Sequence, residues 1–554
     1  MKVSVKFHTD LKLLLAGMRQ ARRPWWEFWR DVADYFLPRR YRWLMTEREN
    51  RTTQLRNRFI LDPRGTMAAK ILASGMMNGI TSPSRPWLRL RIAGRAEEIS
   101  GPVREWLDEV TRRMLLTMAE SNWYNALAVM YLDLVIFGTA SMLIYEDEQD
   151  VVRCYNNALG EYYLDQGPDL KVNAFAREFN YTVRQCVTQF GEENTSNTVK
   201  DKWKLGGARL LDNIKIIHVI QPNDRNDPNV NKAFPFVEYY WEETAELGNV
   251  LSAKGFFELP GIFPRWETVG NDVYGVAPAM DALPDVIQLQ HETKAKGQSL
   301  DYMNRPPVLA DIQLEHRPTS LLPKGITYIA GLSNGHVGAK PIYTVTPPLR
   351  EMGEDIAQIQ VRIGEHFHND LFRMISQLDT VRSATEIDGR REEKLVLLGP
   401  VLERFENEAL DPGILRLYGI MNRAGLIPEM PPGLEDSDIE IQYVSILSDA
   451  QRAVGTVSVE RFVQFVGNLA GVRPEVLDIP DWDELVRDYG DALAVPSKNI
   501  NDRDETAALR EARQQKDSIA QASAVADPLT NAARNLSETN VGGGANALQS
   551  ILGG

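Results

Sequence analysis

The segment from about residue 278 to 425 constrains the fold most, because it alternates long helical stretches with short breaks. Over residues 349–374 apolar side chains recur every three or four positions, which predicts one amphipathic helix. This stripe consists of Met352, Ile356, Ile359, Ile363, Phe367, Leu371 and Met374. A weaker stripe predicts a first helix over 279–304, through Val286, Leu289, Thr293, Leu300 and Met303. Helices with such thin stripes cannot make the core of a lone subunit, so the pattern predicts an assembly of identical chains.

The stretches around these two helices complete the pattern. Residues 306–348 form a proline-bounded insert with strand-forming segments, which is too short for an independent domain. A polar break at 376–383 follows the second helix, which would be roughly 39 Å long at 1.5 Å per residue. A third helix is expected to begin near Ala384, to kink at Gly399-Pro400 and to break at Pro412-Gly413.

The N-terminal 60 residues are predicted to be helical around residues 24–32. Pro24 suits the first position of a helix, and Pro38 ends the pattern. Trp25, Trp29, Val32 and Phe36 share one face, which favours a helix packed inside the protein. A helix lying in a membrane interface is the alternative.

The remaining segments predict a mixture of helices and strands, hence an α+β fold. Helices are expected at 63–80, 102–120 and 123–137, the last closed by Gly138. Residues from there to about 270 are expected to form strands, among them 141–145, 213–220 and 236–241. A strand at 439–444, small helices up to about 493 and a charged helix at 501–520 follow, and the tail beyond Asp527 is expected to be mobile.

Length and charge limit the class of protein. A chain of 554 residues is expected to form several domains. No apolar run is long enough for a membrane span, and no signal peptide is expected at the N-terminus. Cys154 and Cys186 have no metal-type spacing and suit a reducing compartment. The net charge is -14, although residues 1–60 carry fourteen Lys and Arg against six Asp and Glu, a local charge of +8. An acidic bulk argues against ordinary binding to duplex DNA.

Motifs for catalysis are not found in the sequence. It lacks a phosphate-binding G-x-x-x-x-G-K-[ST] loop, an H-E-x-x-H pair and a G-x-S-x-G turn. His366 and His368 stand two positions apart on a predicted helix, so they should point away from each other. Glu146, Asp147 and Glu148 are expected to be a solvated cluster in a turn. We therefore predict no catalytic, cofactor or metal site, with a metal-dependent nucleic-acid enzyme and a peripheral membrane scaffold as the alternatives.

Several short motifs, in a fixed order, resemble the portal (head-to-tail connector) proteins of short-tailed bacteriophages. They are Leu61–Thr66, Ala73–Gly79, Thr81–Leu90, Asp133–Ala140, Arg177–Phe179, Pro264–Trp266, Tyr274–Met280 and Pro306–Val308. Each motif is weak alone, but their order and spacing over residues 20–500 make the resemblance specific. Nothing comparable is found after about residue 500.

The resemblance implies a ring, usually of twelve subunits, at one capsid vertex, through which a terminase packages DNA and the genome later leaves. It implies a wing (1–278), a stem helix (279–305), a clip (306–348), a second stem helix (349–375) and a tunnel loop (376–383). The wing resumes at 384–448, followed by a crown (449–500) and a C-terminal helix with a flexible tail (501–554). The implied fold is mainly helical, with a β-rich wing portion and a small α/β clip.

The resemblance also indicates which residues meet the partners. The expected channel and tunnel-loop residues are Arg373, Ser376, Gln377, Leu378, Asp379, Thr380, Val381, Arg382 and Ser383. The clip residues expected to dock the terminase or a tail adaptor are Glu315, His316, Arg317, Lys324 and Lys340. Arg373 and Arg382 would contact phosphates or form ion pairs between subunits, two interpretations of equal weight. Capsid and scaffolding proteins are further expected partners, with assembly in the host cytoplasm.

Overall fold

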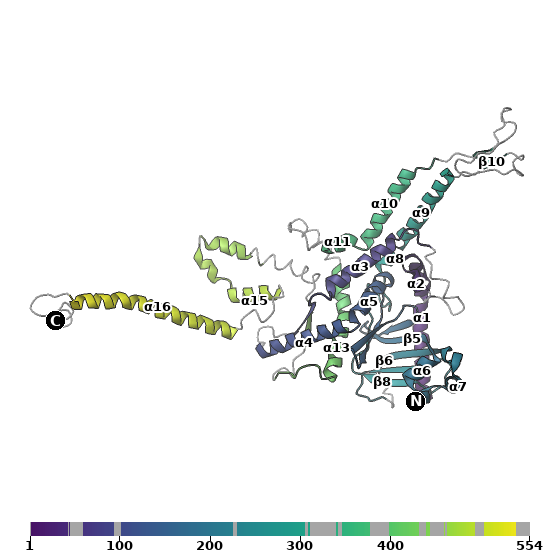
Figure 1. The fold of residues 1–554 in the computed structure, drawn as a ribbon, viewed down its shortest axis with the longest axis horizontal. Coiled ribbons are helices and arrows are strands. Elements are labelled where there is room, and N and C mark those ends of the chain that lie inside the picture. The colour runs from purple at the N-terminus through teal and green to yellow at the C-terminus, as the bar shows by residue number, and fades with distance from the viewer. Residues whose placement is uncertain are drawn as a thin grey trace, which may run out of the picture. The chain divides into compact units, whose positions relative to one another are not determined.

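The computed structural model describes residues 2–41, 44, 59–92, 101–224, 230–304, 308–310, 339–341, 346–376, 398–431, 439–443, 459, 462–471, 473–492 and 503–538. These residues divide into two compact units. Unit 1 holds residues 1–91, 108–429 and 439–451, and unit 2 holds 92–107, 430–438 and 452–554. Unit 1 carries the sheets and a projecting pair of helices (Figure 1).

Helix α1 (Val5–Phe36) opens unit 1, followed by the short α2 (Pro38–Tyr41). Pro24 lies inside α1, so the prediction that it begins a helix is wrong. A proline inside a helix costs about 3 kcal/mol or more. Tertiary packing offsets that cost, because α1 buries apolar side chains on both sides of the proline. These are Leu11, Leu15, Met18, Trp29, Val32 and Phe36, and the predicted packing face is therefore confirmed from Trp29 onward.

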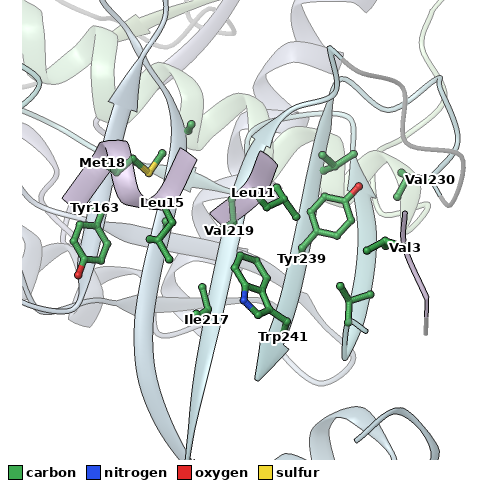
Figure 2. Packing of buried hydrophobic residues seen from close by; sticks show 14 residues of the cluster. Val3, Leu11, Leu15, Met18, Tyr163, Ile217, Val219, Val230, Tyr239 and Trp241 are labelled. Atoms are coloured by element: carbon green, nitrogen blue, oxygen red, sulfur yellow. The ribbon is translucent and has the colours of Figure 1, made fainter. Parts of the chain in front are cut away.

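A five-stranded antiparallel sheet forms the centre of unit 1. Its strands are β4 (Tyr162–Gln166), β5 (Val172–Thr182), β6 (Asn213–Pro222), β7 (Phe236–Glu242) and β8 (Ser252–Phe256), in chain order. The N-terminal half of α1 lies across one face, with Leu11, Leu15 and Met18 against the sheet (Figure 2). Runs of β-branched and aromatic residues bounded by turn formers predicted β6 and β7, and the structure confirms both strands.

Two helices interrupt this sheet, and the sequence did not predict them. Helix α6 (Val183–Phe190) and helix α7 (Asn197–Leu205) lie between β5 and β6. A capping box begins α6, in which Thr182 accepts a hydrogen bond from the Gln185 backbone and the Gln185 side chain bonds back to Thr182. The side chain of Ser196 caps α7. Local capping signals thus compete successfully with the strand-like composition around them.

A smaller three-stranded sheet lies beside long helices. Strands β2 (Met142–Asp147), β3 (Val151–Asn156) and β9 (Gly261–Ile262) pair in the order β3-β2-β9. Helices α3 (Arg64–Ile80), α4 (Gly101–Glu120) and α5 (Trp123–Phe137) agree with the sequence. Gly138 ends α5 with φ 71°, the left-handed conformation that favours glycine. Strand β12 (Ile439–Tyr443) pairs with β1 (Leu88–Ile92). Both cysteines are buried and unpaired.

Two helices of the middle segment project from unit 1 as a hairpin (Figure 1). After the short α8 (Pro278–Asp281), α9 (Leu283–Asn304) runs outward and α10 (Leu349–His366) returns. Strands β10 (Val308–Ala310) and β11 (Ala339–Pro341) pair at the far end. The expected single helix 349–374 is instead two, because the chain turns at Phe367-His368, where His368 has φ 48°. Helix α11 (Asn369–Ser376) continues from that turn.

The third helix of the middle segment stays continuous through Pro412. Residues 398–405 are helical, Glu406–Leu410 form a π-helical turn, and α13 (Asp411–Arg423) follows. The predicted break at Pro412-Gly413 is therefore wrong. The π turn restarts the hydrogen-bond ladder immediately before Pro412, which then occupies a first-turn position that needs no N–H donor. The expected start near Ala384 lies outside the described residues.

Unit 2 contains a 3-10 turn (Pro474–Asp478), α15 (Trp482–Ala492) and α16 (Arg503–Glu538). The Arg510 guanidinium makes a two-point ion pair with the Asp483 carboxylate, at 2.5 and 2.6 Å. Helix α16 continues past Asp527 to Glu538, so the prediction that the helix ends near residue 520 and is followed by a mobile tail is wrong as far as Glu538. The alanine-rich composition of this stretch supports a helix, and residues 539–554 lie outside the described ranges.

Candidate functional site

The base of the hairpin, residues 283–290 of α9 and 359–366 of α10, is its buried part. Val286, Leu289, Ile359 and Ile363 are all buried there. The Asp285 carboxylate pairs with Arg362 at 3.0 Å and with His366 at 3.1 Å, which joins the two helices across the hairpin. His366 ends α10, whereas His368 lies in the turn after it. Among the described residues no group of three or more His, Cys, Asp or Glu is placed to hold a metal.

The projecting part of the hairpin, residues 291–304 and 349–358, contains no buried residue. Several large apolar side chains stay exposed on α9 and α10, among them Ile287, Leu300, Tyr302, Met303 and Val361. Tyr302, in the projecting part, is 49% exposed, and Val361, on the outer side of the base, is 57% exposed. Exposed apolar groups that recur along one element indicate a surface that another chain covers.

Helix α11 rests on α3 through a close approach that needs a glycine. A Cβ atom on Gly75 would lie 2.2 Å from the Phe372 ring, which leaves no room for a side chain at that position. Phe367 and Phe372 are buried, and the Phe367 ring lies 5.8 Å from that of Phe36 in α1. The motif Ala73–Gly79 therefore provides the surface on which α11, the helix before the 376–383 segment, packs.

The helix on the other side of that break is held by a buried ion pair. Glu408 stands in the π-helical turn and accepts hydrogen bonds from the Arg265 guanidinium at 2.7 and 3.1 Å, and from its backbone N–H at 2.9 Å. Arg265 is 3% exposed. A guanidinium and a carboxylate paired at two points fix orientation as well as distance. The motif Pro264–Trp266 thus anchors the chain after the break, as Gly75 anchors it before.

Two further motifs meet at a contact between glycines. A Cβ on Gly138 would lie 2.2 Å from the Gly275 carbonyl oxygen, and a Cβ on Gly275 would lie 2.3 Å from that of Gly138. The Thr139 hydroxyl accepts a hydrogen bond from the Gly275 N–H at 2.8 Å, and the Trp266 N–H donates to the Gly138 carbonyl at 2.9 Å. The motif Asp133–Ala140 therefore packs against the motifs Pro264–Trp266 and Tyr274–Met280, which lie far from it in sequence.

A polar cleft of about 660 Å3 lies away from the hairpin, between the two sheets. Glu238 on its wall accepts hydrogen bonds from His218 at 2.8 Å and from the Tyr145 hydroxyl. Burial lowers the pKa of His218, although the hydrogen bond to Glu238 opposes this shift. Burial alone would raise the pKa of Glu238, but the hydrogen bonds from His218 and Tyr145 lower it. Since Tyr145 belongs to β2 and Glu238 to β7, this network ties the two sheets together.

The structure describes only part of the predicted functional set. Arg373 and Ser376 lie in α11, at the edge of the break, and Lys340 lies in β11 opposite Leu309. The break residues Gln377, Leu378, Asp379, Thr380, Val381, Arg382 and Ser383 lie outside the described residues, as do the clip residues Glu315, His316, Arg317 and Lys324. Sequence reasoning did not identify Arg265 and Glu408, although Arg265 stands in a motif.

One protein family matches this chain over most of its length. A model described as bacteriophage head to tail connecting protein matches residues 8–500. The chain therefore belongs to that family, whose members are structural proteins rather than enzymes.

Named relatives specify the family further. The portal protein of Salmonella phage epsilon15 is 38% identical over 529 residues, covering 95% of this chain and 94% of its own. The probable portal protein of Bordetella phage BPP-1 is 38% identical over 524 residues, 93% of each chain. Among solved structures, the neck of an empty GTA particle aligns with a TM-score of 0.33 and 13% identity, covering 76% of this chain and 90% of its own.

The family and the two portal relatives confirm the resemblance to phage portal proteins and a portal function at the junction of head and tail in the virion. The described helices and strands confirm the mixed α and β fold. Within the described part of the chain, no helix is long and apolar enough to cross a bilayer. The buried face of α1 also places Trp29, Val32 and Phe36 inside the protein rather than at a membrane surface.

Proposed function

We propose that copies of this chain form a ring of twelve around a channel, through which a terminase packages the double-stranded DNA genome and through which the genome later leaves. The observation that carries the proposal is the projecting part of the hairpin, which has no buried residue of its own. Burial of apolar surface contributes roughly 25 cal/mol per Å2. Identical neighbours supply that burial to every hairpin at once, and a closed ring leaves no hairpin without a neighbour.

The charge of the hairpin suits a passage for DNA. Helices α9 and α10 carry seven Asp and Glu against four Lys and Arg. Each lasting contact between a cation and a phosphate strengthens binding and slows sliding. A weakly repulsive lining keeps the duplex centred and lets it move in either direction.

The 376–383 break is proposed as the tunnel loop, with Leu378 and Val381 narrowing the channel. Arg373 and Arg382 would contact phosphates transiently during passage. Their alternative role is an ion pair between neighbouring subunits. Arg382→Gln separates the two: loss of phosphate contact changes packaging velocity in intact rings, whereas loss of an intersubunit ion pair lowers the stability of the ring itself.

The insert 306–348 is proposed as the clip, at the far end of the stem hairpin. The pairing of β10 with β11 closes its base. Glu315, His316, Arg317, Lys324 and Lys340 supply charged groups for docking the terminase and later a tail adaptor. The wing (residues 1–278 and 384–448) and the crown (residues 449–500) would meet capsid and scaffolding proteins during assembly in the host cytoplasm.

The mass of the native particle tests the ring directly. Native mass spectrometry of the purified full chain should give a species near twelve times 62.6 kDa. A monomer at all concentrations would exclude the ring. Deletion of residues 306–348 should abolish adaptor binding or ring closure, and unchanged assembly with unchanged adaptor binding would exclude the proposed clip.

A further inference from the structure

The turn Leu61–Arg64, before α3, is bonded to both helices of the hairpin. The Gln290 side-chain oxygen in α9 accepts from the backbone N–H groups of Leu61 and Asp62, at 2.7 and 2.9 Å. The Gln290 amide nitrogen donates to the Asp62 carbonyl at 3.0 Å. One buried side chain of α9 therefore makes three hydrogen bonds to this turn.

The Asp62 carboxylate extends the connection to α10. One carboxylate oxygen accepts from the Arg64 backbone N–H at 2.9 Å, at the start of α3. The other accepts from the Gln360 amide at 2.8 Å. The Arg64 Nε also donates to the Gln360 carbonyl at 3.3 Å. Asp62 is thus bonded to α3, α9 and α10 together.

The hydrogen bonds around Asp62 select one tilt of the hairpin, which apolar packing does not do. Val286 and Ile363 bury surface without selecting one helix tilt, because the hydrophobic effect has no direction. Hydrogen bonds weaken steeply with angle. Residues 291–304 extend roughly 21 Å beyond Gln290 at 1.5 Å per residue. A tilt of about 10° at the base therefore moves the end of α9 by about 4 Å.

We propose that Asp62, with Gln290 and Gln360, positions the stem: the three residues set the tilt of the hairpin relative to α3. In the ring, on which this role rests, the same bonds would align the far ends of all hairpins and hence the clips that meet the partners. Asp62 is a positioning residue that acts through the two helices, with no contact to DNA.

Exchanging the hydrogen-bond donor and acceptor between residues 62 and 360 tests this positioning role. Gln360→Glu places two carboxylates against each other and breaks the bond between Asp62 and residue 360. Adding Asp62→Asn restores a donor and an acceptor with reversed roles. Gln358→Glu, the same change at an exposed site two residues away on α10, is the matched control.

Spin labels at Leu300→Cys in α9 and Met67→Cys in α3 report the tilt, since both sites are exposed while Cys154 and Cys186 are buried. Electron–electron resonance on the full chain, diluted with unlabelled chain, should give one narrow distance distribution. Gln360→Glu should shift or broaden it by several ångströms, the double variant should restore it, and Gln358→Glu should leave it unchanged.

An unchanged distribution in Gln360→Glu, or no recovery in the double variant, would overturn the proposal. If Gln360→Glu does not fold, Gln360→Leu removes the bond without adding charge and gives the same test. The distance is measured within one chain, so it stays interpretable even if native mass shows no ring. A failure of the positioning role is therefore distinguished from a failure of ring formation.

Discussion

The base and the projecting part of the hairpin belong to the same two helices but are stabilised in different ways. At the base, apolar residues are buried against α3 and α1, and polar side chains bond to the Leu61–Arg64 turn. In the projecting part every residue is at least partly exposed, and Leu300, Tyr302 and Met303 face solvent in the single chain. The base is therefore complete within one subunit, whereas the projecting part is complete only with neighbours. Substitutions of residues buried in unit 1, the base of the hairpin included, should lower the stability of the monomer. Substitutions in the projecting part should lower the stability of the assembly.

Trp29→Ala should have the largest effect on the single chain. The Trp29 side chain is fully buried and packs edge-on against Tyr274 with ring centroids 5.0 Å apart. Its removal should lower the free energy of unfolding by about 3–5 kcal/mol, as measured by denaturant unfolding of the monomer. Phe28→Ala, at an exposed position next to it, is the control. Equal effects of the two variants would contradict the assignment of this face of α1 to the core.

Gly75→Ala should destabilise the packing of α11 on α3 more than the rest of unit 1. The added Cβ would overlap the Phe372 ring, so we expect a loss of about 1–3 kcal/mol from overpacking. Amide hydrogen exchange should increase in α11 more than in the five-stranded sheet. Gly17→Ala, with nothing within 4 Å of the added atom, should be neutral or stabilising. An undisturbed α11 would show that the close approach is not required.

The pH dependence of stability should also distinguish the body from the hairpin. Burial, and secondarily Lys12, lowers the pKa of His8 to about 4, and His8 Nδ1 accepts a hydrogen bond from the Gly248 N–H. Between pH 6.5 and 4 the unfolded chain binds a proton at this site that the folded chain does not. Stability from His8 is therefore present above pH 6.5 and is lost as pH falls toward 4.

His8→Gln should flatten the fall in melting temperature over that interval by several degrees. His291→Gln, at an exposed position in the projecting part of the hairpin, should leave the profile as it is. If the melting temperatures of the native chain and of His8→Gln fall in parallel between pH 6.5 and 4, His8 does not contribute to the loss of stability in acid.

Met303→Ser should have the smallest effect on the monomer and a clear effect on the ring. Because Met303, in the projecting part, is 45% exposed in the single chain, its replacement should change monomer stability by less than about 0.5 kcal/mol. In the proposed ring, an apolar side chain buried at a neighbour would be lost, so the concentration at which rings form should rise. Native mass measurements across a dilution series give that concentration. A lowered monomer stability with unchanged assembly would contradict the conclusion that the projecting part is stabilised by neighbouring subunits.

Periodicity and terminators in the sequence predicted most helices and strands of the body. A repeat of three to four residues predicted the helix that contains Val286 and Met303, and strand-forming composition predicted the strands at 213–220 and 236–241; the structure confirms all three. The errors occur where local rules compete. Pro24 and Pro412 read as helix boundaries, yet α1 continues through one, and a π turn accommodates the other.

The residues of the candidate site were harder to predict than the elements that carry them. The motif containing Asp62 was visible in the sequence, but its partners Gln290 and Gln360 are more than 200 residues away. Arg265 and Glu408 are also distant in the chain, 143 residues apart, and no spacing rule connects them. A motif shows that a stretch matters, and only the packed structure shows which distant group it meets.

By itself the sequence determined the acidic balance and the thin apolar stripes of the middle segment, and it predicted the order of helix, insert, helix and break. Each of these depends on residues close together in the chain, whose periods of two or 3.6 residues are fixed by backbone geometry. Tertiary structure alone decided that Gly75 seats Phe372, that Gly138 faces Gly275, and that Asp62 joins three helices. Such contacts depend on where distant segments come to rest against one another, which local periodicity does not encode.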